Sequence, residues 1–295
     1  MSDSLTCVST PSLAALPIRR LTPRDLVACA DLSEDRGWPR EEHKWGLLLA
    51  GGTGYGIDDP VGGLVTACVV TEYGPHERPE LAAIGMVLVA ERHARQGVGR
   101  RLMRHVIERM GPTPLTLHAT VYGRPLYEEL GFKVIGRAEM VRGAFTPDDT
   151  ESGVFTRPAT AEDLAPVLRL DEEVFGTDRT HMITRLPAFA DQLRVAEENG
   201  RITGYAAAWP NMATQVVGPL VARDTTTAKA LVSSLAARTD RPLRTDIDTR
   251  HEDLLSWLKE RGLASVGFNA VMAHGIPELP GDWTRRFAPL TVAAG

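Results

Sequence analysis

Long hydrophobic runs are missing from this chain of 295 residues. No stretch of about eighteen consecutive apolar residues occurs, which a membrane-spanning helix would need. The first residues lack a basic head followed by a long apolar core, as a secretory signal would have. A formal net charge of −5 leaves no basic surplus for nucleic acid and mildly favours cationic substrates. We expect a cytoplasmic protein with no membrane or nucleic-acid partner.

Cysteine is scarce, and histidine does not cluster. The three cysteines, Cys7, Cys29 and Cys68, are odd in number and far apart, which fits neither a disulfide framework nor a zinc knuckle. The eight histidines show no HExxH spacing. We therefore expect no metal.

The chain is longer than most single domains, and an apolar share of 43% allows it to build cores. We expect two domains of about 150 residues each. Ser, Thr and Pro dominate residues 1–15, which predicts a flexible N-terminal tail. A polar stretch over residues 146–154 predicts a linker, so the expected domains are residues 16–145 and 155–295.

The stretch Gly85–Met110 carries the clearest chemical signal. The apolar run Met86–Val89 predicts a buried strand, and apolar residues spaced by four after Val98 predict an amphipathic helix. Gly97 and Gly99 lie between them, where backbone N–H groups and the positive end of the helix dipole suit an anionic phosphate. Arg95, Arg100 and Arg101 add positive charge. The stretch predicts a pyrophosphate site.

Three phosphate ligands are possible at such a turn. A dinucleotide fingerprint needs a third glycine where this chain has Leu102, and a nucleoside-triphosphate loop needs a Gly-Lys-Ser/Thr that is absent. The pyrophosphate of coenzyme A remains. The alternative is a surface turn with solvated arginines.

A second segment supports the coenzyme. Residues 126–132, with the sequence LYEELGF, predict a short helix closed by Gly131 before another strand. With the glycine turn they resemble the GNAT superfamily of N-acetyltransferases, although the leading Arg or Gln of its motif would fall on Ala94. The resemblance implies an α/β (α+β mixed) fold of GNAT-like domains, each a central mixed, mostly antiparallel sheet flanked by helices.

The organisation repeats after residue 155. Residues 157–164 echo residues 19–26, residues 218–222 echo residues 85–90, and a predicted helix ending before Gly262 echoes the one before Gly131. Residues 223–229, which follow Ala222 directly, contain no glycine, and Leu258 stands where the first copy has Tyr127. This arrangement resembles tandem GNAT proteins with a complete N-terminal and a degenerate C-terminal domain.

The resemblance also implies roles for individual residues. Acetyl-CoA would be the co-substrate, and the Leu88 N–H would donate to the developing oxyanion on the strand beside which pantetheine lies. Tyr127 would be the general acid, because a phenol with an ordinary pKa of about 10 carries a proton at neutral pH. The implied coenzyme-binding residues are Val87, Leu88, Val89, Arg95, Gln96, Gly97, Val98, Gly99 and Arg100.

The sequence offers several candidates for the general base. His118 on a predicted strand is one candidate, since an imidazole with a pKa of about 6.5 can deprotonate an ammonium group. Glu72, Glu80 and an ordered water chain are other candidates, and His118 can equally be a structural residue.

The glycine-rich residues 51–56 predict a flexible connection or a substrate lid.

We therefore expect an N-acetyltransferase acting on a small-molecule or peptide primary amine by direct attack. Two alternatives are an acyltransferase whose donor is an acyl carrier protein or a longer acyl-CoA, and a non-catalytic protein that binds acyl-CoA. A homodimer is possible for any of them.

Overall fold

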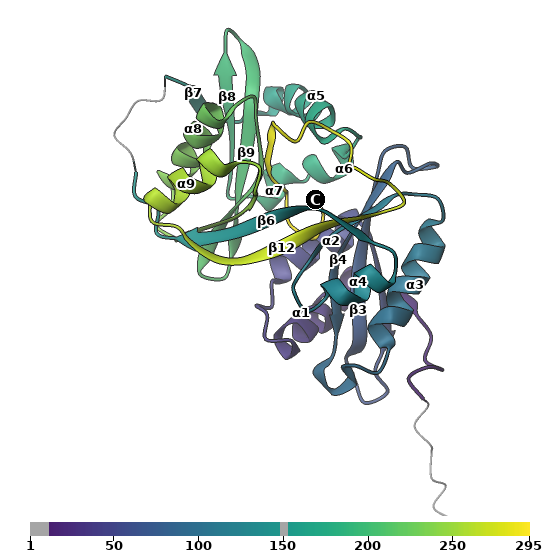
Figure 1. Ribbon diagram of the computed structural model, residues 1–295. Coiled ribbons are helices and arrows are strands. Elements are labelled where there is room, and N and C mark those ends of the chain that lie inside the picture. Colours follow the sequence, from purple (N-terminus) through teal and green to yellow (C-terminus); the bar gives the residue numbers. More distant parts are fainter. Residues whose placement is uncertain (1–11, 148–152) are drawn as a thin grey trace, which may run out of the picture.

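The computed structural model describes residues 12–147 and 153–295. Figure 1 shows two units, one coloured purple to blue and one coloured green to yellow, joined by the long strands β6 and β12. The N-terminal half contains, in chain order, β1 (Arg19–Leu21), α1 (Leu26–Asp35), α2 (Glu42–Gly51), β2 (Thr53–Asp58), β3 (Leu64–Tyr73), β4 (Leu81–Val89), α3 (Val98–Met110), β5 (Leu115–Ala119), α4 (Arg124–Glu129) and β6 (Lys133–Gly143).

The C-terminal half repeats this order with a few additions. Its elements are β7 (Phe155–Pro158), α5 (Leu164–Phe175), α6 (Thr180–Ile183), α7 (Leu186–Phe189), β8 (Gln192–Glu198), β9 (Arg201–Asn211), β10 (Thr214–Ala222), α8 (Thr225–Ala236), β11 (Leu243–Asp248), α9 (Glu252–Glu260), β12 (Ala264–His274) and β13 (Arg286–Ala288).

The first turn of each half shows the duplication most directly. Thr22 and Asp25 form a capping box, and Arg19 binds Asp25 with an N···O distance of 2.7 Å. In the second half Thr160 and Asp163 form the same box, and Arg157 binds Asp163 at 2.6 Å. Because both halves stabilise their first helix through the same contacts, the predicted internal repeat is confirmed here.

Each half places its strands in the same order. In the first, β1 to β5 are neighbours in sequence order, antiparallel except for the parallel pair β4 and β5. In the second, β7 to β11 repeat the pattern with β10 and β11 parallel. This is the mixed, mostly antiparallel sheet with flanking helices that the sequence predicts.

The two halves exchange their last long strands, which the sequence did not predict. β12 from the second half inserts between β5 and β6 of the first, antiparallel to both. β6 in turn pairs with β11 of the second half. Within residues 12–147 and 153–295 the two sheets thus join into one sheet of 13 strands, in which β13 pairs with β10 off the main order. Each half completes the sheet of the other.

The glycine-rich segment is not a lid, contrary to the sequence-based expectation. Residues 53–58 form strand β2, which lies between β1 and β3. A Cβ on Gly54 would lie 2.8 Å from the Cβ of Leu21, and one on Gly56 would lie 2.9 Å from Leu21 Cδ2. Glycine is used here because Leu21 packs directly against the strand, not because the backbone moves.

The largest apolar cluster contains buried residues from both halves, among them Trp45, Leu88, Tyr205 and Leu290.

Of the predicted linker, residues 148–152 lie outside the described residues, as do residues 1–11 of the predicted tail. Past residue 11, the carbonyls of Leu13 and Leu16 accept hydrogen bonds from Arg101. Within the described ranges we find no helix long and apolar enough to cross a membrane.

Candidate functional site

The turn before α3 has the form that the sequence predicts. Gly97 is the N-cap of α3, has a φ of 78° and bears no side chain that could cap the helix. A Cβ at this position would have open space around it. The first hydrogen bond of the helix runs from the Arg101 N–H to the Gly97 carbonyl. In the described chain, the N–H groups of residues 98–100 donate to no protein acceptor, so they are available to an anion.

The arginines near this turn do not all serve it. Arg101 donates to the carbonyls of Leu13 and Leu16, and Arg100 forms an ion pair with Glu129 at the end of α4. Arg95 and Gln96 are exposed. The backbone therefore supplies the main anion-binding groups, with Arg95 adding an exposed positive charge.

Strand β4 leaves part of one edge unpaired next to this turn. The pairing of β4 with β5 covers only residues 82–84 of β4. Met86 then has a φ of 53°, and the register against β3 shifts in the same region. Val87 and Val89 are half-buried beyond this irregularity. An unpaired edge of this kind can accept an extended ligand as an added strand, which fits a pantetheine arm running from the α3 turn.

Gly99 lets three elements meet at the same point. A Cβ on Gly99 would lie 3.2 Å from Val89 Cγ2 and 3.7 Å from Leu126 Cδ2. Helix α3 can therefore approach both β4 and α4, which puts the helix N-terminus, the strand edge and Tyr127 within one site.

Tyr127 on α4 is buried, with 8% of its surface exposed. It packs in the apolar cluster of α3, β4 and β5, near Cys68. Burial raises the pKa of its phenol above the ordinary value. A Cβ on Gly123 would lie 3.1 Å from the Tyr127 ring, so glycine at that position leaves room for the ring. The hydroxyl keeps its proton over the physiological pH range.

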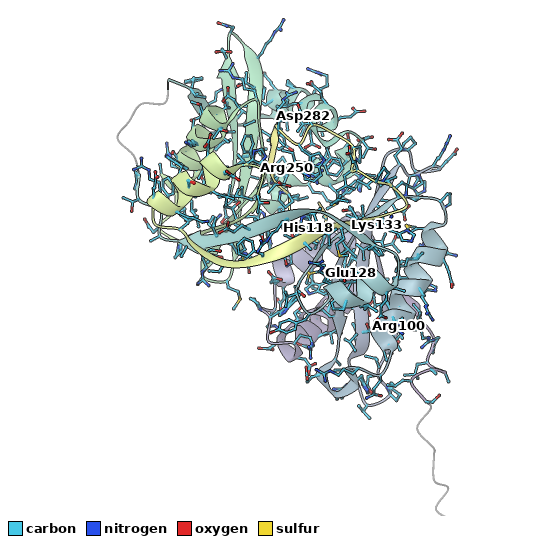
Figure 2. The ribbon with its side chains drawn as sticks, viewed as in Figure 1. Arg100, His118, Glu128, Lys133, Arg250 and Asp282 are labelled. Carbon is cyan, nitrogen blue, oxygen red and sulfur yellow. The ribbon has the colours of Figure 1, made fainter. Side chains whose placement is uncertain are left out.

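His118 lies on the other face of β5, because side chains alternate along a strand and Leu117 and Ala119 face the Tyr127 cluster. Figure 2 shows it near β12, well separated from Arg100. Burial and the positive charge of Arg286 lower the pKa of His118 to about 4. Its imidazole, which also interacts with the Val292 backbone, is therefore neutral at pH 7 and a weak base.

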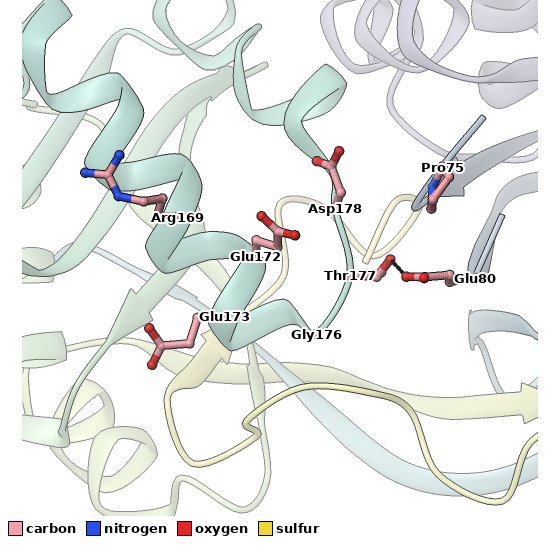
Figure 3. A pocket seen from close by; sticks show the side chains of 8 residues that line it. All are labelled: Pro75, Glu80, Arg169, Glu172, Glu173, Gly176, Thr177 and Asp178. Carbon is pink, nitrogen blue, oxygen red and sulfur yellow. Dashed lines mark hydrogen bonds between the residues drawn. The ribbon is translucent and has the colours of Figure 1, made fainter. Parts of the chain in front are cut away.

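A hollow lined by several acidic residues lies elsewhere. It has a volume of about 800 Å³ and lies between the β3–β4 hairpin and the end of α5 (Figure 3). Glu80 lines it and accepts a hydrogen bond from the Thr177 hydroxyl at 2.6 Å, with Glu172 and Asp178 nearby. This hairpin precedes β4, whereas the α3 turn follows it, so the 9 residues of β4 separate the two. Glu80 therefore lies far from the turn before α3.

The second half lacks both the open helix N-terminus and the unpaired strand edge. At the start of α8, Asp224 is the N-cap, and its carboxylate accepts from the Thr227 N–H at 2.7 Å. A carboxylate there takes the place of a phosphate and repels one. Strand β13 also pairs with β10 at Leu220 and Val221, beyond the short parallel pairing with β11. The chain itself fills the edge that stays open in the first half.

The predicted correspondence of Leu258 with Tyr127 is supported by the local hydrogen bonds. Phe132 N–H donates to the Tyr127 carbonyl, and Leu263 N–H donates to the Leu258 carbonyl. Leu258 is fully buried and has no hydroxyl. The second half therefore holds no equivalent of the proposed proton donor at this position.

Sequence reasoning missed the C-terminal segment, residues 286–295. A Cβ on Gly218 would lie 2.4 Å from the Pro289 carbonyl oxygen, and one on Gly85 would lie 2.3 Å from that of Ala293. The segment therefore passes over the irregular part of β10 and then that of β4. Its short strand gives too little periodicity to be recognised from sequence.

Comparisons with known proteins agree with this geometry. Two family profiles, both described as Acetyltransferase (GNAT) domain, match residues 74–146 and residues 167–288. The uncharacterized N-acetyltransferase YitH of Bacillus subtilis is 27% identical over 230 residues, which cover 77% of this chain and 80% of the relative.

Solved structures share the fold. A putative acetyltransferase from Pyrococcus horikoshii superposes with a TM-score of 0.79 at 20% identity, covering 97% of this chain and 98% of that one. A tandem GNAT protein from the clavulanic acid biosynthesis pathway superposes with a TM-score of 0.62 at 13% identity, covering 89% and 99%. With both halves matched, this chain belongs to the GNAT acetyltransferases and is a transferase with two GNAT domains in tandem.

Proposed function

We propose that this protein transfers an acetyl group from acetyl-CoA to a primary amine, and that only the N-terminal unit binds the coenzyme. The contrast between the halves carries the proposal. The first half keeps unbonded N–H groups at the start of α3 and an unpaired edge on β4, whereas Asp224 and β13 fill the matching places in the second. Acetyl-CoA, when bound, supplies an acyl group activated as a thioester.

Different groups of the first half would bind the coenzyme and stabilise the reacting atoms. The N–H groups of residues 98–100 hold the pyrophosphate, and β4 from Val87 to Val89 aligns the pantetheine arm. A backbone N–H of β4 that faces the unpaired edge stabilises the negative charge that develops on the thioester oxygen. The Leu88 N–H, which the resemblance implies for this role, is directed by the strand register towards Ala67 of β3. Attack by the neutral amine forms the new C–N bond and breaks the C–S bond.

Two protons must move in this reaction. The Tyr127 hydroxyl gives its proton to the departing thiolate, and the extra proton on the new amide nitrogen passes to His118 or to water. Tyr127 and His118 lie on opposite faces of β5, so one faces the thiol side of the site and the other the amine side.

The test is Tyr127→Phe, measured by thiol release from acetyl-CoA with a panel of amines. We expect kcat to fall by roughly a hundredfold or more, with little change in coenzyme affinity, because the change removes a proton donor and no coenzyme-binding group. Tyr122→Phe is the matched control, since Tyr122 is 94% exposed and lies just before α4. Full activity in Tyr127→Phe would refute the general-acid role.

The donor and the catalytic competence are tested in the same assay. Thiol release from longer acyl-CoAs or from an acyl carrier protein, but not from acetyl-CoA, would assign a different donor. Thermal stabilisation by acetyl-CoA without thiol release for any amine would instead identify a coenzyme-binding protein that does not catalyse transfer.

A further inference from the structure

A hollow in the second half lies where strand β7 ends beside the first residues of β8. It has a volume of about 760 Å³ and is bounded by the start of α5, by α7, by β8 and by the turn after α8. Helices α5 and α8 lie on opposite faces of β8 and β9 (Figure 1). The apolar wall of the hollow consists of Leu164, Val167, Ile183, Pro187 and Leu193. A space of this size can hold a small molecule that has an apolar part.

Arg194 on β8 brings a buried positive charge to this hollow. It lines the space and is only 8% exposed. Within the described ranges its side chain donates one hydrogen bond, from Nη2 to the Ser234 carbonyl near the end of α8 at 3.3 Å, and its buried Nε atom has no acceptor. The carbonyl and the negative end of the α8 dipole offset part of the cost of burying the charge. The rest of that cost remains without a carboxylate partner in the described chain.

A second cation lines the same hollow. Arg238 lies in the turn that follows α8 and is exposed. Burial and the positive charge of Arg238 lower the pKa of Arg194, and no carboxylate of the described residues opposes them. Both guanidinium groups keep their protons at neutral pH, because arginine is not deprotonated in proteins. The two groups repel each other, and an anion bound between them would relieve this repulsion.

Two carboxylates also line the hollow, but neither pairs with these arginines. Asp163 is bound by the Nη1 and Nη2 atoms of Arg157 at 2.6 and 2.8 Å. Asp191 is exposed and accepts a hydrogen bond from the side-chain amide of Gln215 at 2.8 Å. The Asp191 carboxylate would repel a second negative charge on a ligand, so the hollow favours a monoanion over a phosphate.

The internal repeat shows that the fold does not require an arginine at position 194. Arg19 and Arg157 form the same contacts in the two halves, and the register counted from them places Tyr55 of β2 where β8 has Arg194. Tyr55 is 5% exposed and packs in an apolar cluster with residues of α3. An uncharged ring thus takes in the first half the place that a guanidinium group takes in the second. A buried charge at a place that the fold can fill with an apolar ring indicates a role in binding.

We propose that this hollow binds a small monocarboxylate with an apolar chain. The carboxylate pairs with the guanidinium groups of Arg194 and Arg238, and the chain lies along the apolar wall. All the lining residues belong to the second half, so the site is separate from the turn before α3 and does not depend on acetyl transfer. The half without an open helix N-terminus would then have a ligand site of its own.

The first experiment measures the binding of hexanoate to the full-length protein. The melting temperature is recorded against hexanoate concentration, which gives a dissociation constant in the absence of acetyl-CoA. We expect Arg194→Met to bind hexanoate about tenfold or more weakly than the wild type, because it removes a charged hydrogen-bond donor. Arg238→Met should weaken binding roughly threefold, since this cation is exposed. Arg241→Met is the matched control, because Arg241 is exposed but does not line the hollow, and it should bind hexanoate as the wild type does.

Three results would overturn the assignment. Equal dissociation constants for the wild type and Arg194→Met would show that hexanoate binds elsewhere. No stabilisation of the wild type by hexanoate would show that the hollow takes no such ligand. Equal weakening in Arg238→Met and Arg241→Met would mean that hexanoate responds only to the general charge of the surface.

The second experiment varies the ligand and tests its chemical class. Hexanamide has the same chain without the charge, and acetate has the charge without the chain. We expect each to bind the wild type about tenfold or more weakly than hexanoate, because each loses one of the two kinds of contact. Hexanamide binding as tightly as hexanoate would refute the role of the arginines. Inorganic phosphate binding more tightly than hexanoate would refute the preference for a monocarboxylate.

Stability without ligand supplies the third readout. Arg194→Met should leave the melting temperature unchanged or raise it, because it removes a buried charge at a place where the first half has an uncharged side chain. Arg157→Met is the contrasting variant and should lower it by about 5 °C or more, since it strands the buried Asp163 carboxylate. A comparable loss in Arg194→Met, together with unchanged hexanoate binding in Arg238→Met, would identify Arg194 as a structural residue and overturn the proposal.

Discussion

Replacing Gly97 with aspartate would place in the first half the charge that Asp224 carries in the second. Gly97 is exposed, has a φ of 78° and has no heavy atom close enough to clash with a Cβ. Asparagine and aspartate tolerate this left-handed conformation better than other side chains and have the same shape. Gly97→Asn therefore serves as a control that differs from Gly97→Asp in charge alone.

The size of the effect follows from Coulomb's law. The new carboxylate would lie roughly 6 Å from a diphosphate held by the N–H groups of residues 98–100. With an effective dielectric constant of about 40 at this exposed site, the repulsion is about 1.4 kcal/mol for each phosphate charge. We expect coenzyme A to bind Gly97→Asp about tenfold or more weakly than Gly97→Asn.

Calorimetric titration of both variants with coenzyme A at two salt concentrations would measure this difference in affinity. The two variants should melt at similar temperatures without ligand, and the difference in affinity should shrink as salt screens the charges. Equal affinities of Gly97→Asp and Gly97→Asn at low salt would show that the phosphates bind elsewhere, which would remove the basis of the site at α3.

Three further predictions concern other parts of the fold. Gly123→Ala should lower kcat with little loss of coenzyme affinity, because its Cβ would push on the Tyr127 ring at 3.1 Å; unchanged kcat would place the reacting thiol away from Tyr127. For His118, whose pKa falls from 6.5 to about 4 on folding, the unfolded chain binds more protons between these values, so stability is lost as the pH falls from 6.5 towards 4. In urea titrations at pH 7.5 and at pH 5, the free energy of unfolding of His118→Gln should fall by on the order of 2 kcal/mol less than that of the wild type. Equal decreases in the two proteins would contradict the lowered pKa. A fragment of residues 1–147 should fail to give a cooperative melting transition, because it lacks the β12 partner of β5 and β6; a soluble, folded and active fragment would contradict the structural role of the exchange.

Local features of the site could be predicted from the sequence. The glycine turn, the helix after it and the short helix carrying Tyr127 depend on contacts within about thirty residues, and their boundaries agree with the structure. The absence of these features from the second half was also predictable, because residues 223–229 contain no glycine and Leu258 stands in the place of Tyr127.

Features that depend on distant contacts were not predictable in this way. The glycines of β2 suggested a mobile loop, since the sequence does not show that Leu21 packs against them. Strand β12 has the pattern of any buried strand, and nothing in that pattern says which strands it pairs with. Arg286 looks like any arginine until the fold shows that it is buried and that its charge lowers the pKa of His118.

The exchange of β6 and β12 has a consequence for how such a chain could arise. A single copy of this repeat would leave its last strand without the sheet that receives it, so it would need a second copy to fold. Two identical copies would then form a symmetric swapped dimer with two copies of the candidate site. Fusing them into one polypeptide keeps the partner present at all times and lets one copy lose its chemistry without loss of the assembly.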